Sequence, residues 1–165
     1  MKASYIKVYL LFFIHIILSG CKHNPVEKYY YVFPAGYEGP AFVIFNQEDG
    51  ILPEVENDIK VFNFSETGYL KVKEKAKSTW IVESVFTYDS KGKRTKIPSY
   101  DNVSQLDTVN KDRVIAFGFI RGSDTNPANN QPTIYESFCI SKVKYLDSIL
   151  NKRERFSFSI FEKAR

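Results

Sequence analysis

A β-hairpin is predicted by the stretch Trp80-Ile81-Val82-Glu83-Ser84-Val85-Phe86-Thr87-Tyr88-Asp89-Ser90-Lys91-Gly92-Lys93-Arg94-Thr95-Lys96-Ile97-Pro98. The runs 80–88 and 94–98 are rich in β-branched and aromatic residues, and a polar tetrad separates them. Aspartate at its first position and glycine at its fourth suit a type I turn. This segment therefore predicts two paired antiparallel strands.

Similar short runs recur on both sides of the hairpin. Residues 114–120 are apolar on both faces, which predicts a central strand. In residues 69–75, Leu70 and Val72 alternate with lysines, as in a strand with one face in water. Further strands are expected at residues 29–33, 41–45, 59–64 and 134–143.

One segment has helical spacing. Leu146, Ile149 and Leu150 share one face of a helix predicted over residues 143–151. Residues 156–161 alternate like a strand, and near a terminus they could equally form an apolar tail. The polar segment 122–132 predicts a long loop. We expect an all-β, mainly antiparallel fold, either a β-sandwich or a small barrel, with one short C-terminal helix.

The N-terminus has the pattern of an export signal. Lys2 and Lys7 precede the apolar run 8–18, which is short for a membrane-spanning helix. The next residues, Leu18-Ser19-Gly20-Cys21, resemble the lipobox of bacterial lipoproteins. This resemblance implies cleavage before Cys21, a diacylglyceryl thioether on its sulfur, and acylation of its new amino group with a chain such as palmitate. Several acyl chains give stable membrane anchoring. The alternative is an ordinary secretory signal with a chance cysteine.

The expected organisation follows from this signal. Residues 1–20 form the lipoprotein signal peptide, 21–28 a lipid-anchored tether, 29–145 the β-domain, and 146–165 a helical or strand-like extension. The expected location is the bacterial cell envelope. Because Lys22 rather than aspartate follows the cysteine, we expect the outer membrane in a diderm host and the plasma membrane in a monoderm one.

Composition excludes several kinds of partner and chemistry. The 165-residue chain carries a net charge of +4, which falls to +2 once Lys2 and Lys7 are removed, so no nucleic-acid partner is expected. The only histidines are His15 in the signal and His23 in the tether. The β-domain therefore lacks histidine-based nucleophilic triads and the usual zinc sites. We expect no cofactor and no metal.

Three residues of the β-domain are candidate functional groups. Cys139, which Cys21 leaves without a disulfide partner, is either a reactive thiol or, as its apolar surroundings favour, a buried small hydrophobe. Glu83 is the best single candidate for a catalytic or binding carboxylate, although the strand pattern favours an outward-facing residue. Tyr37, between Gly36 and Gly39, either belongs to a binding loop or folds back over the core, which the motif favours.

Residues 31–46 (Tyr-Val-Phe-Pro-Ala-Gly-Tyr-Glu-Gly-Pro-Ala-Phe-Val-Ile-Phe-Asn) contain a strand ending in proline, a turn with two glycines around a tyrosine, and a second strand. This segment resembles the opening of a family of small bacterial lipoproteins whose mature domain is labelled only as a domain of unknown function. Residues 68–71, 89–94 and 135–138 match later landmarks of that family. Pro40 and Ser141 depart from its pattern. The resemblance implies a lipoprotein with a β fold, and it transfers no functional residue.

The sequence favours a non-enzymatic, membrane-anchored envelope lipoprotein whose β-domain binds an unknown protein or glycan or has a structural part. The alternatives are an envelope hydrolase that works through carboxylates and a carrier of an apolar ligand. Two buried carboxylates converging in a cleft would favour the hydrolase, and a closed barrel with an apolar cavity would favour the carrier. Basic clusters at 71–77 and 91–96 either contact anionic lipids or glycans, or form solvated strand edges.

Overall fold

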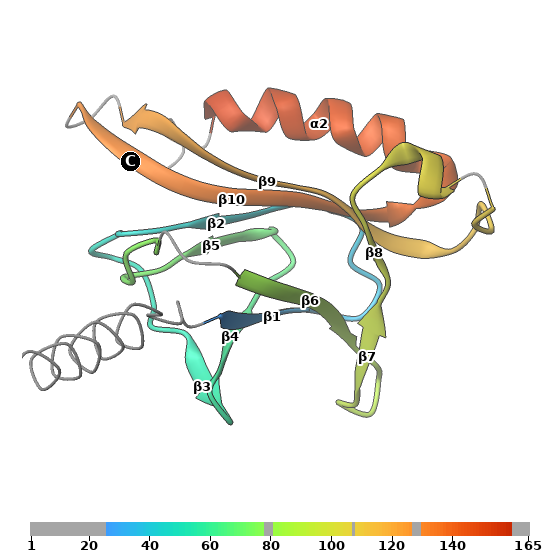
Figure 1. The fold of residues 1–165 in the computed structure, drawn as a ribbon, viewed down its shortest axis with the longest axis horizontal. Helices are drawn as coiled ribbons and strands as arrows, with labels where there is room; N and C mark the ends of the chain where they lie inside the picture. The colour runs from blue at the N-terminus through green and yellow to red at the C-terminus, as the bar shows by residue number, and fades with distance from the viewer. Residues whose placement is uncertain (1–25, 78–80, 107, 127–129, 160–165) are drawn as a thin grey trace, which may run out of the picture.

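The computed structural model describes residues 26–77, 81–106, 108–126 and 130–159. Their strands form two five-stranded sheets that face each other as two layers (Figure 1). The first sheet has the order β3-β4-β1-β6-β7. Its strands are β1 (Glu27–Phe33), β3 (Glu54–Glu56), β4 (Ile59–Asn63), β6 (Ile81–Tyr88) and β7 (Arg94–Ile97).

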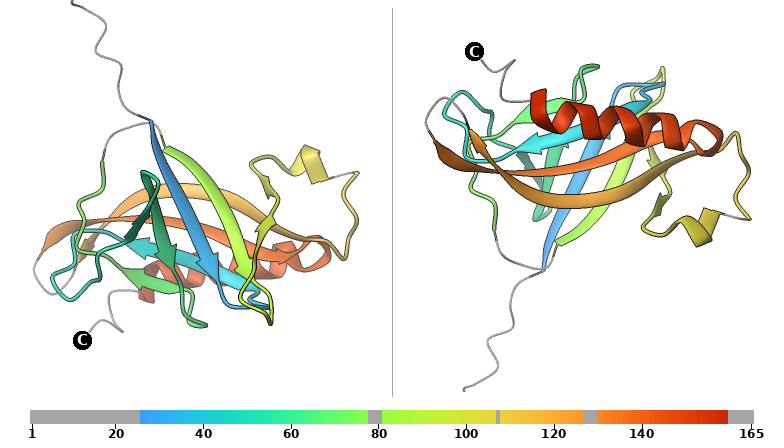
Figure 2. Two further views of the ribbon diagram at one scale, coloured as in Figure 1. Left: turned by 90° about the horizontal axis from the view of Figure 1, so that it is seen from below. Right: turned by 90° about the horizontal axis from the view of Figure 1, so that it is seen from above.

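The second sheet has the order β5-β2-β10-β9-β8. Its long hairpin of β9 and β10 forms most of the upper layer in Figure 1. The strands of the two sheets cross steeply when the molecule is seen from below (Figure 2). The second sheet comprises β2 (Gly39–Ile44), β5 (Tyr69–Lys71), β8 (Ser99–Tyr100), β9 (Val114–Asn126) and β10 (Gln131–Lys142).

These two sheets confirm the expected all-β class, and they form a sandwich-like pair rather than a closed barrel. Both are mixed: among the described strands, β1 runs parallel to β4 and β6, β2 to β5, and β8 to β9. The predicted hairpin at 80–98 is present, since β6 and β7 pair antiparallel and Gly92 N donates to Asp89 O at 3.0 Å. Local turn chemistry determines that pairing, whereas parallel pairing joins segments that are distant in the chain.

The core between the sheets is mostly aromatic. Phe138 on β10 is fully buried, and its ring stacks on Phe119 with centroids 4.5 Å apart. Phe33 on β1 stacks on Phe64 at 4.2 Å. Large rings at inward positions of both sheets therefore fill the space between the layers.

The outer face of the second sheet is covered by α2 (Leu146–Ser159), which follows η2 (Val143–Tyr145) and contacts β10 and β2 (Figures 1 and 2). A smaller apolar cluster under it includes Leu106 of η1 (Val103–Leu106), Ile115 and Leu146. No helix in the described part of the chain is long and apolar enough to cross a membrane.

Two sequence-based expectations differ from the structure. Residues 156–159 continue α2 instead of forming a strand, because good helix formers at 152–155 extend the helix beyond the predicted end. Most of the predicted loop 122–132 belongs to β9 and β10, which pair as far as Asn126 and Gln131. Cross-strand hydrogen bonds here override the loop-like composition.

Candidate functional site

A cavity of about 270 Å³ lies between the two sheets. β6 contributes its wall from one layer, and β9 and β10 contribute the wall from the other. The side chains of Glu83, Arg121 and Glu136 therefore line the same cavity as apolar side chains. The lining residues are Ile81, Glu83, Phe119, Ile120, Arg121, Glu136 and Ser137.

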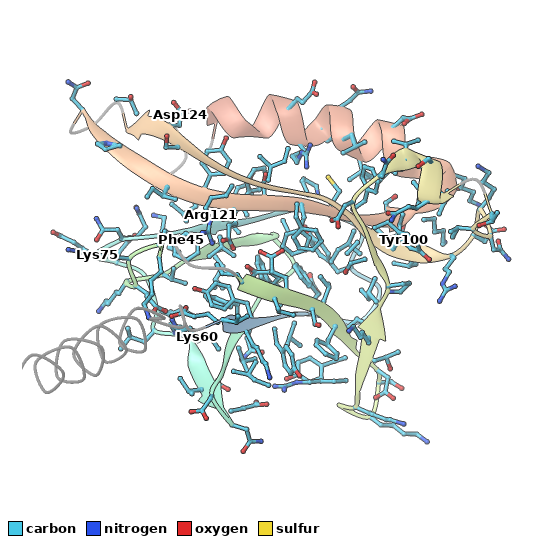
Figure 3. All side chains as sticks on the ribbon, in the orientation of Figure 1. Phe45, Lys60, Lys75, Tyr100, Arg121 and Asp124 are labelled. Carbon is cyan, nitrogen blue, oxygen red and sulfur yellow. The ribbon has the colours of Figure 1, made fainter. Side chains whose placement is uncertain are left out.

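Strand pairing places the polar groups of this site. Arg121 of β9 lies directly opposite Glu136 of β10 in the antiparallel register. Figure 3 shows Arg121 beneath these strands, on the side that faces the first sheet. In that sheet β1 and β6 pair in parallel, and Glu83 lies beside Tyr29. The second sheet thus supplies Arg121 and Glu136, and the first supplies Glu83.

Glu136 is buried and fully engaged, with a side chain that is 5% exposed. The Tyr31 hydroxyl donates a hydrogen bond to Glu136 Oε2, and Arg121 Nη2 donates to Oε1 in an ion pair. Arg121 also donates from Nη1 to the backbone oxygen of Lys77 at 2.9 Å. A buried carboxylate requires this kind of compensation, because removal from water disfavours the charged form. We name Tyr31, Arg121 and Glu136 the inner triad.

Glu83 has a different environment. Burial raises its pKa, and the neighbouring Arg121 guanidinium opposes this only in part, which leaves a pKa of about 7. Burial, together with the nearby Glu83, also raises the pKa of Tyr31 well above its usual value, so this phenol remains a hydrogen-bond donor. Glu83 thus binds a proton more readily than an ordinary carboxyl group, beside a carboxylate whose charge Arg121 neutralises.

A network of ion pairs adjoins the site where β1 begins. Lys60 contacts Glu27 at 3.0 Å and also pairs with Glu74, while Lys77 contacts Glu27 at 2.5 Å. Burial opposes ionisation of Glu27, but hydrogen bonds from Lys77, Lys60 and Tyr29 outweigh it and lower the pKa to about 2. Since the Lys77 carbonyl accepts from Arg121, the network also orients the inner triad.

The structure brings only some of the predicted site residues to this cavity. Glu83 lies in it, so the interpretation of Glu83 as an outward-facing residue is wrong. Tyr37 is not among the lining residues. It stacks on Phe33 with centroids 4.9 Å apart and donates to Pro40 O at 2.5 Å. The lipobox Leu18, Ser19, Gly20 and Cys21 lies outside the described residues.

Cys139 lies on the other side of β10 from this site. Its side chain is fully buried, and burial raises the pKa of the thiol to about 11. A thiol with such a pKa carries almost no thiolate at neutral pH and reacts slowly.

The basic clusters are partly neutralised. Lys71 pairs with Asp49 at 2.8 Å, and Arg94 makes two hydrogen bonds to Glu56, at 2.6 and 2.8 Å. These contacts are typical of charged strand edges. No cluster of three or more metal-ligating side chains occurs within the described ranges.

Sequence reasoning missed the inner triad. Tyr31 and Glu136 are 105 positions apart, so nothing local connects them. One signal was present in the sequence. In an alternating strand, Glu136 points to the same face as Ile134 and Phe138, which predicts an inward-facing acid. An inward acid requires a partner, and Arg121 was the nearest arginine before it in the chain.

Comparisons with known proteins agree with this architecture. The chain is similar to a crystal structure described as “Putative Lipoprotein from Bacillus anthracis”, with a TM-score of 0.51 and 22% identity, over 70% of this chain and 72% of that chain. At this identity the likeness shows the fold alone. No match is found among curated proteins. Residues 26–143 match the model described as “Family of unknown function (DUF6843)”. This match confirms the resemblance to an uncharacterised lipoprotein domain, and the chain belongs to the DUF6843 family.

Proposed function

We propose that this chain is a lipid-anchored lipoprotein of the bacterial cell envelope whose β-domain is a non-enzymatic binding domain. The cavity between the sheets is its binding site. The observation that carries this proposal is the combination of a partly apolar space of about 270 Å³ and Glu83, a lining acid that, unlike Glu136, forms no ion pair among the described residues. Small-ligand sites typically combine apolar walls with a few convergent polar groups.

The ligand is a chemical group small enough to enter the cavity. It is either free or displayed on an envelope protein or glycan. An anchored domain would meet such a partner at the membrane surface, in the outer membrane of a diderm host or the plasma membrane of a monoderm one. The presence of charged groups in the cavity disfavours a carrier for purely apolar ligands, since three of its lining side chains are Glu83, Arg121 and Glu136.

Anchoring rests on Leu18-Ser19-Gly20-Cys21 and is supported by the lipoprotein description of the similar fold. Cys21→Ser is expected to abolish incorporation of labelled palmitate and to block cleavage of the signal, because serine has no thiol to alkylate. Cys139→Ser is the matched control and should label and mature normally. Normal labelling and maturation of Cys21→Ser would show that the lipobox assignment is wrong.

An envelope hydrolase is the second candidate, since two carboxyl groups, Glu83 and Glu136, line one cavity. A pair of acids with different protonation is the arrangement that hydrolases use for acid and base roles. Binding is favoured because both oxygens of Glu136 are already occupied, by the Tyr31 hydroxyl and by Arg121. A carboxylate held in this way is poorly placed to attack a substrate or activate a water.

A substrate screen separates these two candidates. The full-length protein is expected to show no turnover of ester, glycoside, peptide or phosphate substrates. Hydrolysis that is lost in Glu83→Gln but retained in Glu54→Gln, an exposed acid on β3, would establish the hydrolase in place of the binding domain.

A further inference from the structure

The cavity contains one acid whose charge is not matched. The Arg121 guanidinium pairs with Glu136 and also donates to the Lys77 backbone oxygen. Within the described residues, no ion pair joins Glu83 to a lysine or arginine. The inner triad is therefore close to neutral as a unit, and Glu83 decides the net charge of the cavity. When Glu83 ionises, that net charge is −1.

The walls beside Glu83 are apolar. Ile81 comes from the same strand, while Phe119 comes from β9 in the opposite sheet. Phe119 is fixed by stacking on the buried Phe138. Ile120, which lies opposite Ser137, is 47% exposed and points to the outer face of the sheet, because neighbouring residues of a strand point to opposite faces. A ligand in this space thus meets hydrocarbon on both sides and a carboxyl group from β6.

We propose that the cavity binds a small organic monocation, a primary ammonium group on a short apolar chain, with the ammonium at Glu83 and the chain against Ile81 and Phe119. This inference rests on the proposed function and adds the chemical class of the ligand. An ammonium donates up to three hydrogen bonds and supplies the charge that the Glu83 carboxylate lacks. Its methylene groups gain by leaving water for the apolar wall.

Other ligand classes fit the same groups less well. An anion would have to pair with Arg121, whose charge is already neutralised by Glu136. The carboxylates of Glu83 and Glu136 would also repel it. A bare divalent ion needs several oxygen ligands, and Glu136 has both of its oxygens engaged. A neutral alcohol could bind the wall and accept or donate one hydrogen bond, but it would not offset the charge of an ionised Glu83.

The proposed binding is coupled to a proton. The groups that face Glu83 are Arg121 from β9, the Tyr31 hydroxyl from β1, Glu136 from β10, and Asp101 beyond β8. The pKa of Glu83 is about 7, so an ammonium that pairs with the ionised form must displace a proton at lower pH. Affinity should then fall by about tenfold from pH 8 to pH 6, because one group of this pKa loses most of its ionised fraction.

The test uses three ligands of equal length: n-butylammonium, n-butanol and butyrate. They are titrated into the full-length protein in zwitterionic lipid nanodiscs, with isoleucine methyl groups labelled for NMR. The methyl groups of Ile81 report occupancy of the cavity, and those of Ile115, under α2, are the internal reference. Empty nanodiscs measure partitioning of each ligand into lipid.

The expected result is that n-butylammonium shifts the Ile81 signals with an affinity at pH 8 at least about tenfold above that of n-butanol, since it adds a charge-assisted hydrogen bond. Glu83→Gln should remove this preference, and Glu54→Gln should retain it. The pH dependence of the unmodified protein is an independent measurement that requires no variant.

Each other outcome contradicts a distinct statement. If n-butanol or butyrate binds as well as n-butylammonium, the ligand class is wrong while ligand binding in the cavity stands. If n-butylammonium binds equally well at pH 6 and pH 8, or equally well to Glu83→Gln, then Glu83 is not its partner. If none of the three ligands shifts the cavity signals, the proposed binding site fails as well.

Discussion

Phe138→Ala is expected to lower the free energy of unfolding by about 4 kcal/mol, within the range of large aromatic deletions in cores. Phe138 is fully buried, and its ring contacts rings from both sheets: Phe119 at 4.5 Å, Tyr31 at 5.1 Å and Phe33 at 5.9 Å between centroids. Alanine would leave a cavity that the surrounding strands, fixed by hydrogen bonds, cannot close. Urea denaturation of the full-length protein, followed by circular dichroism, measures the change.

The control is Leu52→Ala at a side chain that is 71% exposed. It removes an apolar side chain without opening a cavity and should change the free energy of unfolding by less than about 0.5 kcal/mol. A loss below about 1 kcal/mol for Phe138→Ala would show that the layers are not held together by this aromatic core.

Local features of the chain were predictable from sequence. The β6–β7 hairpin depends on Asp89 and Gly92, and each acts within its own turn: Asp89 Oδ1 accepts hydrogen bonds from the backbone of Lys91 and Lys93, and Gly92 has a φ of +76°. The strand type of β2, β4 and β9 follows from runs of β-branched and aromatic residues. The class of the fold is the sum of such local preferences.

Pairing between distant segments was not predictable in the same way. β1 lies between β4 and β6 and runs parallel to both, so its neighbours begin about 30 and 50 residues later in the chain. No turn joins these strands directly. Their register depends on which side chains fill the common core, and a single sequence does not specify that choice.

The candidate site depends on that same long-range packing. Glu83 on a largely apolar strand was visible as an isolated acid, but its direction depends on the register of β6 against β1. Glu136 and Arg121 become a pair only in the register of the β9–β10 hairpin, which places the two residues directly opposite each other. Each acid of the cavity was therefore identifiable as a residue, whereas their convergence required the structure.

Glu83 should make the stability of the protein depend on pH in the neutral range. Burial raises its pKa from the unfolded value of 4.5 to about 7. A carboxyl group with a raised pKa favours the folded state while it is protonated. Its contribution is fully present below pH 4.5 and is lost as the pH rises through 7. Glu27 behaves in the opposite way: its pKa of about 2 gives a contribution that is present above pH 4.5 and is lost as the pH falls toward 2.

Glu83→Gln is expected to raise the free energy of unfolding at pH 8 by about 2 kcal/mol and to leave it nearly unchanged at pH 5. The shift from 4.5 to about 7 corresponds to an upper limit of about 3.4 kcal/mol. Because Glu83 is only partly buried, water screens part of this energy. Glutamine has the shape of the protonated acid and no charge, so it retains the packing beside Ile81 and Phe119 and removes the cost of an ionised group at alkaline pH.

Urea denaturation of the wild-type protein and of Glu83→Gln at pH 5 and pH 8 measures this difference. Taking the difference between variants removes the pH dependence of all other groups, including the ion pairs of Glu27. Glu54→Gln, exposed on β3, controls for the loss of a carboxylate in general. A Glu83→Gln variant no more stable than wild type at pH 8 would mean that water or a charge partner already compensates the Glu83 carboxylate. The cavity would then have no unmatched charge with which to select an ammonium, so this stability measurement also tests the premise of ligand recognition.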